Sequence, residues 1–221
     1  VWQGLYNELR DKGLMVITVA QDIGGVEVAR QWIEAAKPAH PALVDQSHLV
    51  SELYDMVNVP TAVWIDEDGN IVRGPEPAGA EDSFRQMDRT TYAMPEAATA
   101  AIRTTQRAYL EALRDWVANG PASRYIAHPN VPAGSGETAA EAAVAAAEFQ
   151  MGEYLYGRGE PALAQRHFEE AKRLRPESWT YKRQAWALED PMKSGGPEFW
   201  AAVDALGDRP YYPATNLEGP A

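Results

Sequence analysis

Cysteine is absent from this chain of 221 residues. Within these residues, the absence excludes disulfide bonds, metal sites built on thiolates and catalysis by a cysteine nucleophile. Redox chemistry at sulfur would therefore need a thiol from outside this sequence.

Long apolar runs and an excess of basic residues are also missing. No run approaches the roughly 18 consecutive apolar residues that a membrane-spanning helix needs, so no membrane span is expected. The 32 acidic residues outnumber the 20 basic ones, which gives a formal net charge of −12. Because basic patches supply most of the affinity for phosphate backbones, nucleic acid is not an expected partner.

Patterns typical of metal sites and catalytic sites are not found either. Asp66, Asp68 and Asn70 have part of a calcium-loop spacing, but the glutamate at the twelfth position is missing, so we interpret them as a solvated turn. No order of Ser, His and Asp justifies a triad. We predict no catalytic residue, no metal and no cofactor. Four histidines lack paired ligand spacing and are interpreted as surface or packing residues: His40, His48, His128 and His167.

The most informative stretch is an expected β-hairpin. Residues 59–66 are mostly apolar or β-branched, Asp68-Gly69 supplies a turn, and residues 71–73 begin a second strand. Pro60 stands at the start of the first strand, where a missing N–H is tolerated. We expect the Val59–Pro60 bond to be cis and its backbone to lie at an open, concave surface that contacts a ligand.

This hairpin, with Val59-Pro60-Thr61 at its start, resembles the thioredoxin-like superfamily, most closely the redoxin branch that includes the TlpA and ResA proteins. The resemblance extends through residues 1–73. The segments that carry it are an amphipathic helix at 1–12, a buried strand at 14–20, a helix at 27–37, an extended segment at 41–45 and a short helix at 51–56.

The resemblance implies an incomplete α/β thioredoxin-like fold that lacks its first strand, followed by an all-α helical-hairpin region. In the family, a strand ending in a Trp-Cys-x-x-Cys motif precedes the helix that begins here at Val1. We therefore expect a fragment or processed chain, with unpaired strand edges where the missing strand would lie. The resemblance also implies that Val59, Pro60 and Thr61 form the substrate-binding wall, that the substrate is a protein disulfide or thiol, and that the protein is extracytoplasmic.

The second half of the chain is expected to be helical. Residues 74–80, rich in Gly and Pro, break both helix and strand patterns. A helix is predicted at 96–119, after Pro95 and before Gly120-Pro121, and residues 121–136 are predicted to be a linker or loop. The expected division is a partial thioredoxin-like domain at 1–90, a connecting helix and loop at 91–136, and a helical module at 137–221.

Residues 137–176 resemble one tetratricopeptide repeat. Helices are predicted at 138–156 and 161–174, followed by further helices at 179–188 and 198–206 and an irregular tail. Phe168 should fill the space between the first two helices. We expect a docking or self-association surface here, not a catalytic site. The residues at the repeat's characteristic spacings are Gly152, Ala164, Phe168, Ala171 and Pro176.

Three functions agree with these patterns. The first is the C-terminal part of a thiol-disulfide oxidoreductase whose cysteines precede Val1. The second is a redox-inactive adaptor that binds proteins through the thioredoxin-like and helical parts. The third is a peroxiredoxin-like peroxidase. Two cysteines with two residues between them just before Val1 would favour the first function, one cysteine the third, and none the second.

Overall fold

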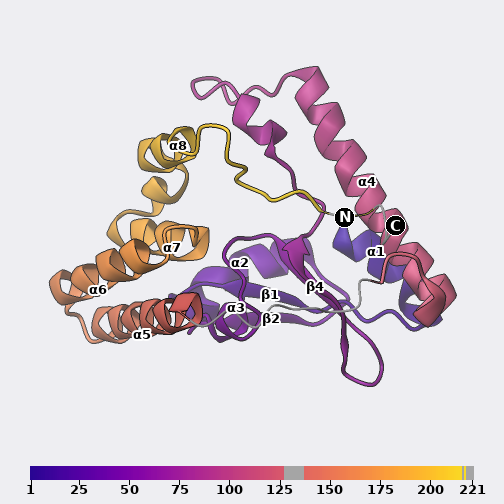
Figure 1. Cartoon of the computed structure of the whole chain (residues 1–221), viewed down its shortest axis with the longest axis horizontal. Coiled ribbons are helices and arrows are strands. Elements are labelled where there is room, and N and C mark those ends of the chain that lie inside the picture. The colour runs from indigo at the N-terminus through magenta and orange to yellow at the C-terminus, as the bar shows by residue number, and fades with distance from the viewer. Residues whose placement is uncertain (127–136, 216, 218–221) are drawn as a thin grey trace. The chain divides into compact units, whose positions relative to one another are not determined.

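The computed structural model describes residues 1–126, 137–215 and 217. It is a mixed α/β structure in which helices predominate, which confirms the predicted fold class at that level (Figure 1). The contacts divide the chain into two compact units. Unit 1 contains residues 1–16 and the described parts of 60–130 and 202–221, and unit 2 contains residues 17–59 and the described parts of 131–201. The division into domains at residues 90 and 136 stays a prediction, because a compact unit of this kind is not a test of independent folding.

Unit 2 begins with a βαβ arrangement. Strands β1 (Thr18–Gln21) and β2 (Ala42–Asp45) pair in parallel, and α2 (Gly25–Ala36) connects them. The predicted first strand starts too early: Leu14 is buried in the core of unit 1, and the ladder begins only at Thr18, opposite Ala42. Hydrophobicity alone predicted the longer strand, whereas a strand extends only as far as a neighbour pairs with it.

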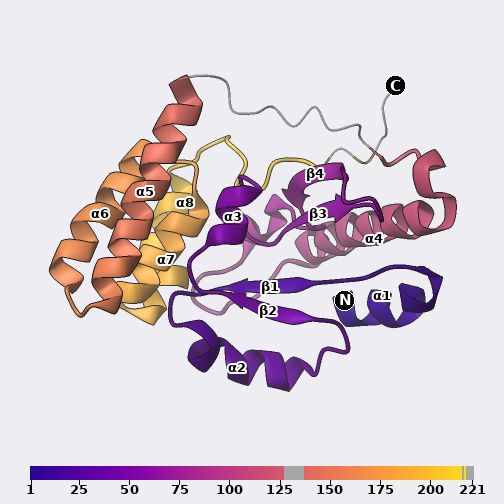
Figure 2. The same cartoon turned by 90° about the horizontal axis from the view of Figure 1, so that it is seen from below.

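The rest of unit 2 is helical. Helices α5 and α6 lie side by side as a hairpin (Figures 1 and 2). The bounds of these elements are α3 (Leu49–Leu53), α5 (Glu137–Gly157), α6 (Pro161–Leu174), α7 (Trp179–Glu189), the 3₁₀ helix η4 (Pro191–Gly195) and α8 (Pro197–Asp204), which crosses the boundary between the units. The predicted helices therefore all form, with ends shifted by at most a few residues.

The α5–α6 hairpin packs as the spacing predicts. Phe168 is 2 % exposed and lies against Phe149, with ring centroids 5.4 Å apart. A Cβ atom at Gly152 would lie 2.5 Å from a ring carbon of Phe168, so the helices approach closely only because residue 152 has no side chain. The small-residue position and the buried aromatic ring are confirmed.

Unit 1 combines a hairpin of strands with helices. Strands β3 (Thr61–Ile65) and β4 (Ile71–Pro77) pair in an antiparallel ladder. The helical elements are α1 (Trp2–Leu9), η1 (Arg10–Lys12), η2 (Asp82–Gln86), α4 (Glu96–Asn119) and η3 (Gly120–Ala122). Helix α4 begins after Pro95 and ends at Gly120, as predicted.

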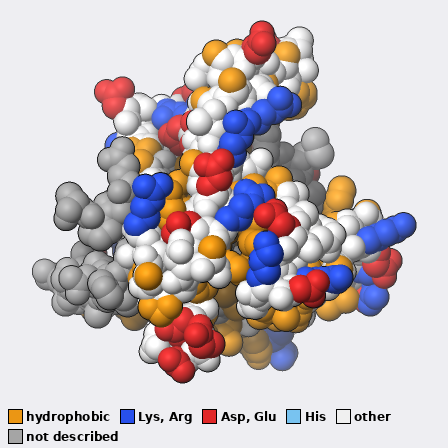
Figure 3. All heavy atoms as spheres, turned by 90° about the vertical axis from the view of Figure 1, so that its right-hand side faces the viewer, with side chains coloured by type: hydrophobic (Ala, Val, Ile, Leu, Met, Phe, Trp, Pro, Cys, Tyr) orange, Lys and Arg blue, Asp and Glu red, His pale blue; other side chains and the backbone are white. Residues whose placement is uncertain are grey.

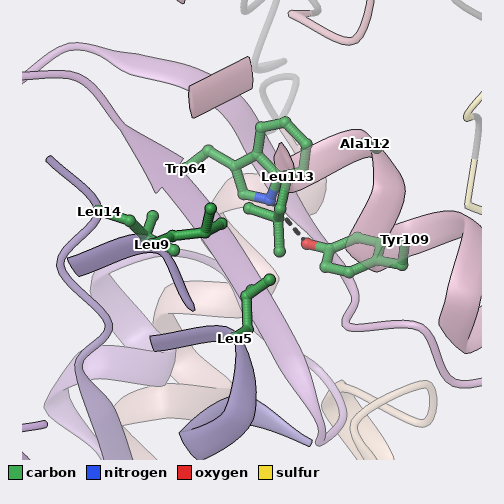
Figure 4. Packing of buried hydrophobic residues seen from close by; sticks show 7 residues of the cluster. All are labelled: Leu5, Leu9, Leu14, Trp64, Tyr109, Ala112 and Leu113. Atoms are coloured by element: carbon green, nitrogen blue, oxygen red, sulfur yellow. Dashed lines mark hydrogen bonds between the residues drawn. The ribbon is translucent and has the colours of Figure 1, made fainter. Parts of the chain in front are cut away.

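The core of unit 1 surrounds Trp64 (Figure 4). Its indole Nε1 donates a hydrogen bond of 2.8 Å to the Tyr109 hydroxyl, so the one polar atom of the indole is satisfied inside an apolar cluster. Arg73 lies over the same indole and pairs with Glu76. The buried members of the cluster are Leu5, Leu9, Leu14, Trp64, Tyr109, Ala112 and Leu113.

The predicted break after Arg73 is wrong, because β4 continues to Pro77. Thr61 pairs with Pro77, and the Ala78 amide donates to the Pro60 carbonyl at 3.1 Å. Backbone N–H groups alternate in direction along a strand, and the Ala78 N–H points to β3, so position 77 is one whose N–H would point away from β3. Pro77 therefore removes no bond from the ladder. Pro75 lies where the register shifts between the pairs Ala62–Glu76 and Trp64–Arg73, and a strand tolerates proline at such a bulge.

Among the helices that the structure describes, none combines the length and the apolar character that a membrane crossing requires.

We predict that Phe168→Ala destabilises the α5–α6 hairpin by about 3 to 5 kcal/mol, through lost transfer energy and the cavity left behind. Urea denaturation followed by circular dichroism measures this change. Leu163→Ala is the control, because Leu163 is on the same helix but 43 % exposed, and it should stay within about 0.5 kcal/mol of wild type. If Phe168→Ala unfolds at the same urea concentration as wild type, the packing is refuted.

Candidate functional site

The three predicted substrate-binding residues lie at the surface, next to the start of β3. Val59 is 38 % exposed, Pro60 is exposed, and Thr61 is the first residue of the ladder with β4. The Val59 amide donates to Oδ1 of the buried Asn58 at 2.9 Å. The boundary between the two units falls between Val59 and Pro60. The cis bond, the concave surface and the role in substrate binding all stay predictions.

The edge of β3 is relevant to that role. Among the described residues, β3 has one strand neighbour, β4, and β1 has one, β2, so each sheet has two strands. One long edge of β3 is therefore not part of a strand ladder. An edge of this kind can pair with an extended polypeptide through main-chain hydrogen bonds.

A second candidate lies within unit 2, around His48. Its ring is 1 % exposed, and Nδ1 lies 2.5 Å from Oε1 of Glu153, whose side chain is 9 % exposed. His48 has a φ of 53°, in the left-handed region, which few residues other than glycine adopt. His48 was interpreted as a surface or packing residue, and it does pack: its ring contacts Phe149 edge to face, with ring centroids 5.2 Å apart.

Two further carboxylates, those of Asp45 and Glu52, act on Glu153 through their charge. Asp45 accepts hydrogen bonds from the amides of Leu49 and Val50, at 3.1 and 2.7 Å, and so caps α3. Glu52 accepts from the Tyr181 hydroxyl. Burial raises the pKa of Glu153 above the usual glutamate value; the bond from His48 opposes this rise, whereas the charges of Asp45 and Glu52 add to it.

An open groove of about 460 Å³ runs beside Glu153. We call it the Glu153 groove. Its lining residues come from the loops that flank α2 and β2 and from the last turns of α5: Ile23, Gln46, Ser47, Gln150, Glu153, Tyr154, Tyr156 and Gly157. Among the described residues that line it, none is a nucleophile with a partnered base.

The other singled-out residues are engaged in local structure. Asp66 accepts hydrogen bonds from the amides of Asp68 and Asn70, at 3.1 and 2.7 Å, so this stretch forms the solvated turn that was predicted. His167 Nδ1 lies 2.6 Å from Oε2 of Glu148. His40 is buried, with its Nδ1 near the Pro41 carbonyl. His128 lies outside the described residues. In the part of the chain that the structure describes, no three metal-ligating side chains gather.

The sequence interpretation missed Glu153 and its groove. His48 and Glu153 are 105 residues apart, and neither belongs to a motif.

On the face drawn in Figure 3, basic side chains lie among acidic and apolar ones, so charge of one sign does not form a single patch there.

No protein-family model, no curated protein and no solved structure matches this chain. The resemblance to the thioredoxin-like superfamily therefore stays a prediction.

We expect Glu153→Gln to change how stability depends on pH. The folded protein holds the Glu153 proton more tightly than the unfolded chain does, so this stabilisation is complete below the unfolded-state pKa and is lost as the pH rises through the folded-state pKa. The variant has no such titration. Its free energy of unfolding, relative to wild type, should therefore increase as the pH rises above the ordinary glutamate pKa of about 4.3.

Urea denaturation at several pH values measures this difference. Glu148→Gln is the matched control, because it removes one carboxylate from a more exposed pair, in which the side chains of His167 and Glu148 are 36 % and 30 % exposed. A difference between Glu153→Gln and wild type that is the same at every pH would contradict the raised pKa.

Proposed function

We propose that this chain is the substrate-recognition part of a thioredoxin-like thiol-disulfide oxidoreductase. The observation that supports the proposal is the order of its elements. A parallel β1–α2–β2 unit is followed by α3, by the exposed Val59-Pro60 and by the antiparallel β3–β4 hairpin. This is the order that the sequence resemblance implies.

The proposed division of labour follows from the residues. Because the chain has no cysteine, the thiols must come from another segment or another protein. One thiolate attacks the substrate disulfide, forming a mixed disulfide and releasing one substrate sulfur as a thiolate. A second thiol then attacks the mixed disulfide, so the thiol pair is oxidised and the substrate is reduced. Val59, Pro60 and Thr61 would hold the substrate backbone in an extended conformation.

A redox-inactive adaptor is the second candidate. The absence of cysteine favours it, and so does the α5–α6 hairpin, whose outward side includes exposed apolar residues such as Val144 and Met151. In an adaptor, the same start of β3 would bind an extended polypeptide without subsequent chemistry. Both candidates therefore share the recognition step, and they differ only in the thiols.

The purified chain should have no thiol-disulfide reductase activity. A methionine thioether has no proton to lose and does not undergo exchange, so the six methionines cannot replace a thiolate. Reduction of insulin in the presence of dithiothreitol, followed by turbidity, measures this activity. A rate above that of dithiothreitol alone would contradict the prediction.

Val59→Asp should weaken binding of an extended polypeptide by about tenfold or more, which corresponds to about 1.4 kcal/mol. The new charge would lose hydration where the substrate backbone is proposed to lie. Carboxamidomethylated insulin B chain is a suitable probe, and isothermal titration calorimetry measures the affinity. Val26→Asp is the matched control, because Val26 is also an exposed valine, at 49 %, and lies on α2.

Equal affinity of Val59→Asp and wild type for the B chain would exclude this site as the recognition surface. A wild-type chain that does not bind the B chain at all would exclude the proposed function itself.

A further inference from the structure

The Glu153 groove combines features that recognise a cation. It lies wholly within unit 2, and none of its lining residues belongs to the Val59–Thr61 segment. An inference about it is therefore independent of the function proposed above. Its volume of about 460 Å³ falls within the roughly 300 to 1,000 Å³ typical of small-ligand sites.

The charge of the groove is negative. Among the described residues, Glu153 is the one charged residue that lines it, and neither Lys nor Arg does. Its Oε1 bonds to His48, which leaves Oε2 as the second acceptor of the carboxylate. Asp45 and Glu52 add negative potential behind it. Because the Glu153 side chain is 9 % exposed, a cation that reaches it would be attracted more strongly than one at a fully exposed carboxylate.

Two tyrosines add a second attraction for a cation. Tyr154 is 59 % exposed and Tyr156 is 37 % exposed, which is more than buried packing residues would be. The Arg158 guanidinium carbon lies 5.8 Å from the centroid of the Tyr154 ring, so this ring already accepts one cation from the chain itself. Because Tyr154 and Glu153 both line the groove, a ligand within it can reach the ring and the carboxylate.

The neutral lining residues suit a side chain that carries such a group. The Gln46 side-chain amide donates to the Ile23 carbonyl at 3.0 Å, and its oxygen remains an acceptor for N–H donors. Gln150 and Ser47 supply further acceptors, whereas Ile23 supplies apolar surface for a methylene stem.

We propose that the Glu153 groove binds the side chain of a lysine or arginine presented by a polypeptide. The cationic head pairs with Glu153 and lies against the Tyr154 ring, while the aliphatic stem contacts Ile23. An anion or a metal ion does not fit this site, because the one charged lining residue is acidic and the described residues bring no three metal ligands together.

The experiment is a titration of the ¹⁵N-labelled full chain with three neutral-capped pentapeptides. They have the form acetyl-Gly-Ala-X-Ala-Gly-amide, in which X is lysine, arginine or norleucine. The lysine and arginine peptides should cause saturable shifts of the Gln46, Gln150 and Tyr154 amide signals, weakened at high salt. The norleucine peptide, which has the stem without the charge, should bind at least tenfold more weakly.

Two variants test the residues. Glu153→Gln keeps the shape and removes the charge, and Tyr154→Ala removes the ring from an exposed position; each should weaken the lysine peptide by at least fivefold. Tyr92→Ala is the matched control, because Tyr92 is 67 % exposed in unit 1, and it should bind like wild type. If Glu153→Gln fails to fold, as its circular dichroism would reveal, Tyr154→Ala decides. The inference is overturned if the norleucine peptide binds as well as the lysine peptide, if no peptide shifts these signals, or if Tyr154→Ala binds like wild type.

Discussion

Phe149 is the residue on which the packing of unit 2 depends, because its ring contacts a side chain from each of three other elements. It lies against Phe168 of α6, stacks on Tyr181 of α7 with ring centroids 4.3 Å apart, and contacts His48 at the start of α3 with the two rings nearly perpendicular. Phe149 is 1 % exposed. Aromatic rings bury large areas with specific geometry. One side chain of α5 therefore determines where α3, α6 and α7 lie around it.

The positions of His48 and Glu153 both follow from this packing. Glu153 is one turn along α5 from Phe149, on a helix that is held in place by the aromatic contacts. Burial there disfavours its charge, and the His48 bond offsets only part of that penalty. The Glu153 groove is thus next to a packed core, and the carboxylate is presented on a rigid element. A binding site gains affinity from such preorganisation.

In unit 1, too, buried polar side chains have partners within the core. The Trp64 indole donates to the Tyr109 hydroxyl, and Arg73 donates to the Tyr125 carbonyl at 2.7 Å while it pairs with Glu76. These bonds connect the β3–β4 hairpin to α4 and to the segment that follows it. We propose that an extended polypeptide binds at the start of β3. Farther along β3, the Trp64 bond holds this strand against α4. The recognition proposed there and the cation binding proposed at Glu153 use different chemistry, main-chain pairing in one case and charge in the other.

Local sequence determined the helices and the turn, and tertiary structure decided the strand limits and the second site. Helices α4 and α6 begin after or at a proline and end at glycine or before Pro176, which are signals that act within a few residues. The Asp66 turn is also local. By contrast, β1 starts at Thr18 because β2 pairs with it there, and β4 continues to Pro77 because β3 pairs with it as far as Thr61, with a register shift at Pro75. The pairing of His48 with Glu153 spans 105 residues. Such contacts depend on how distant segments pack, and no periodicity or motif in the sequence encodes them.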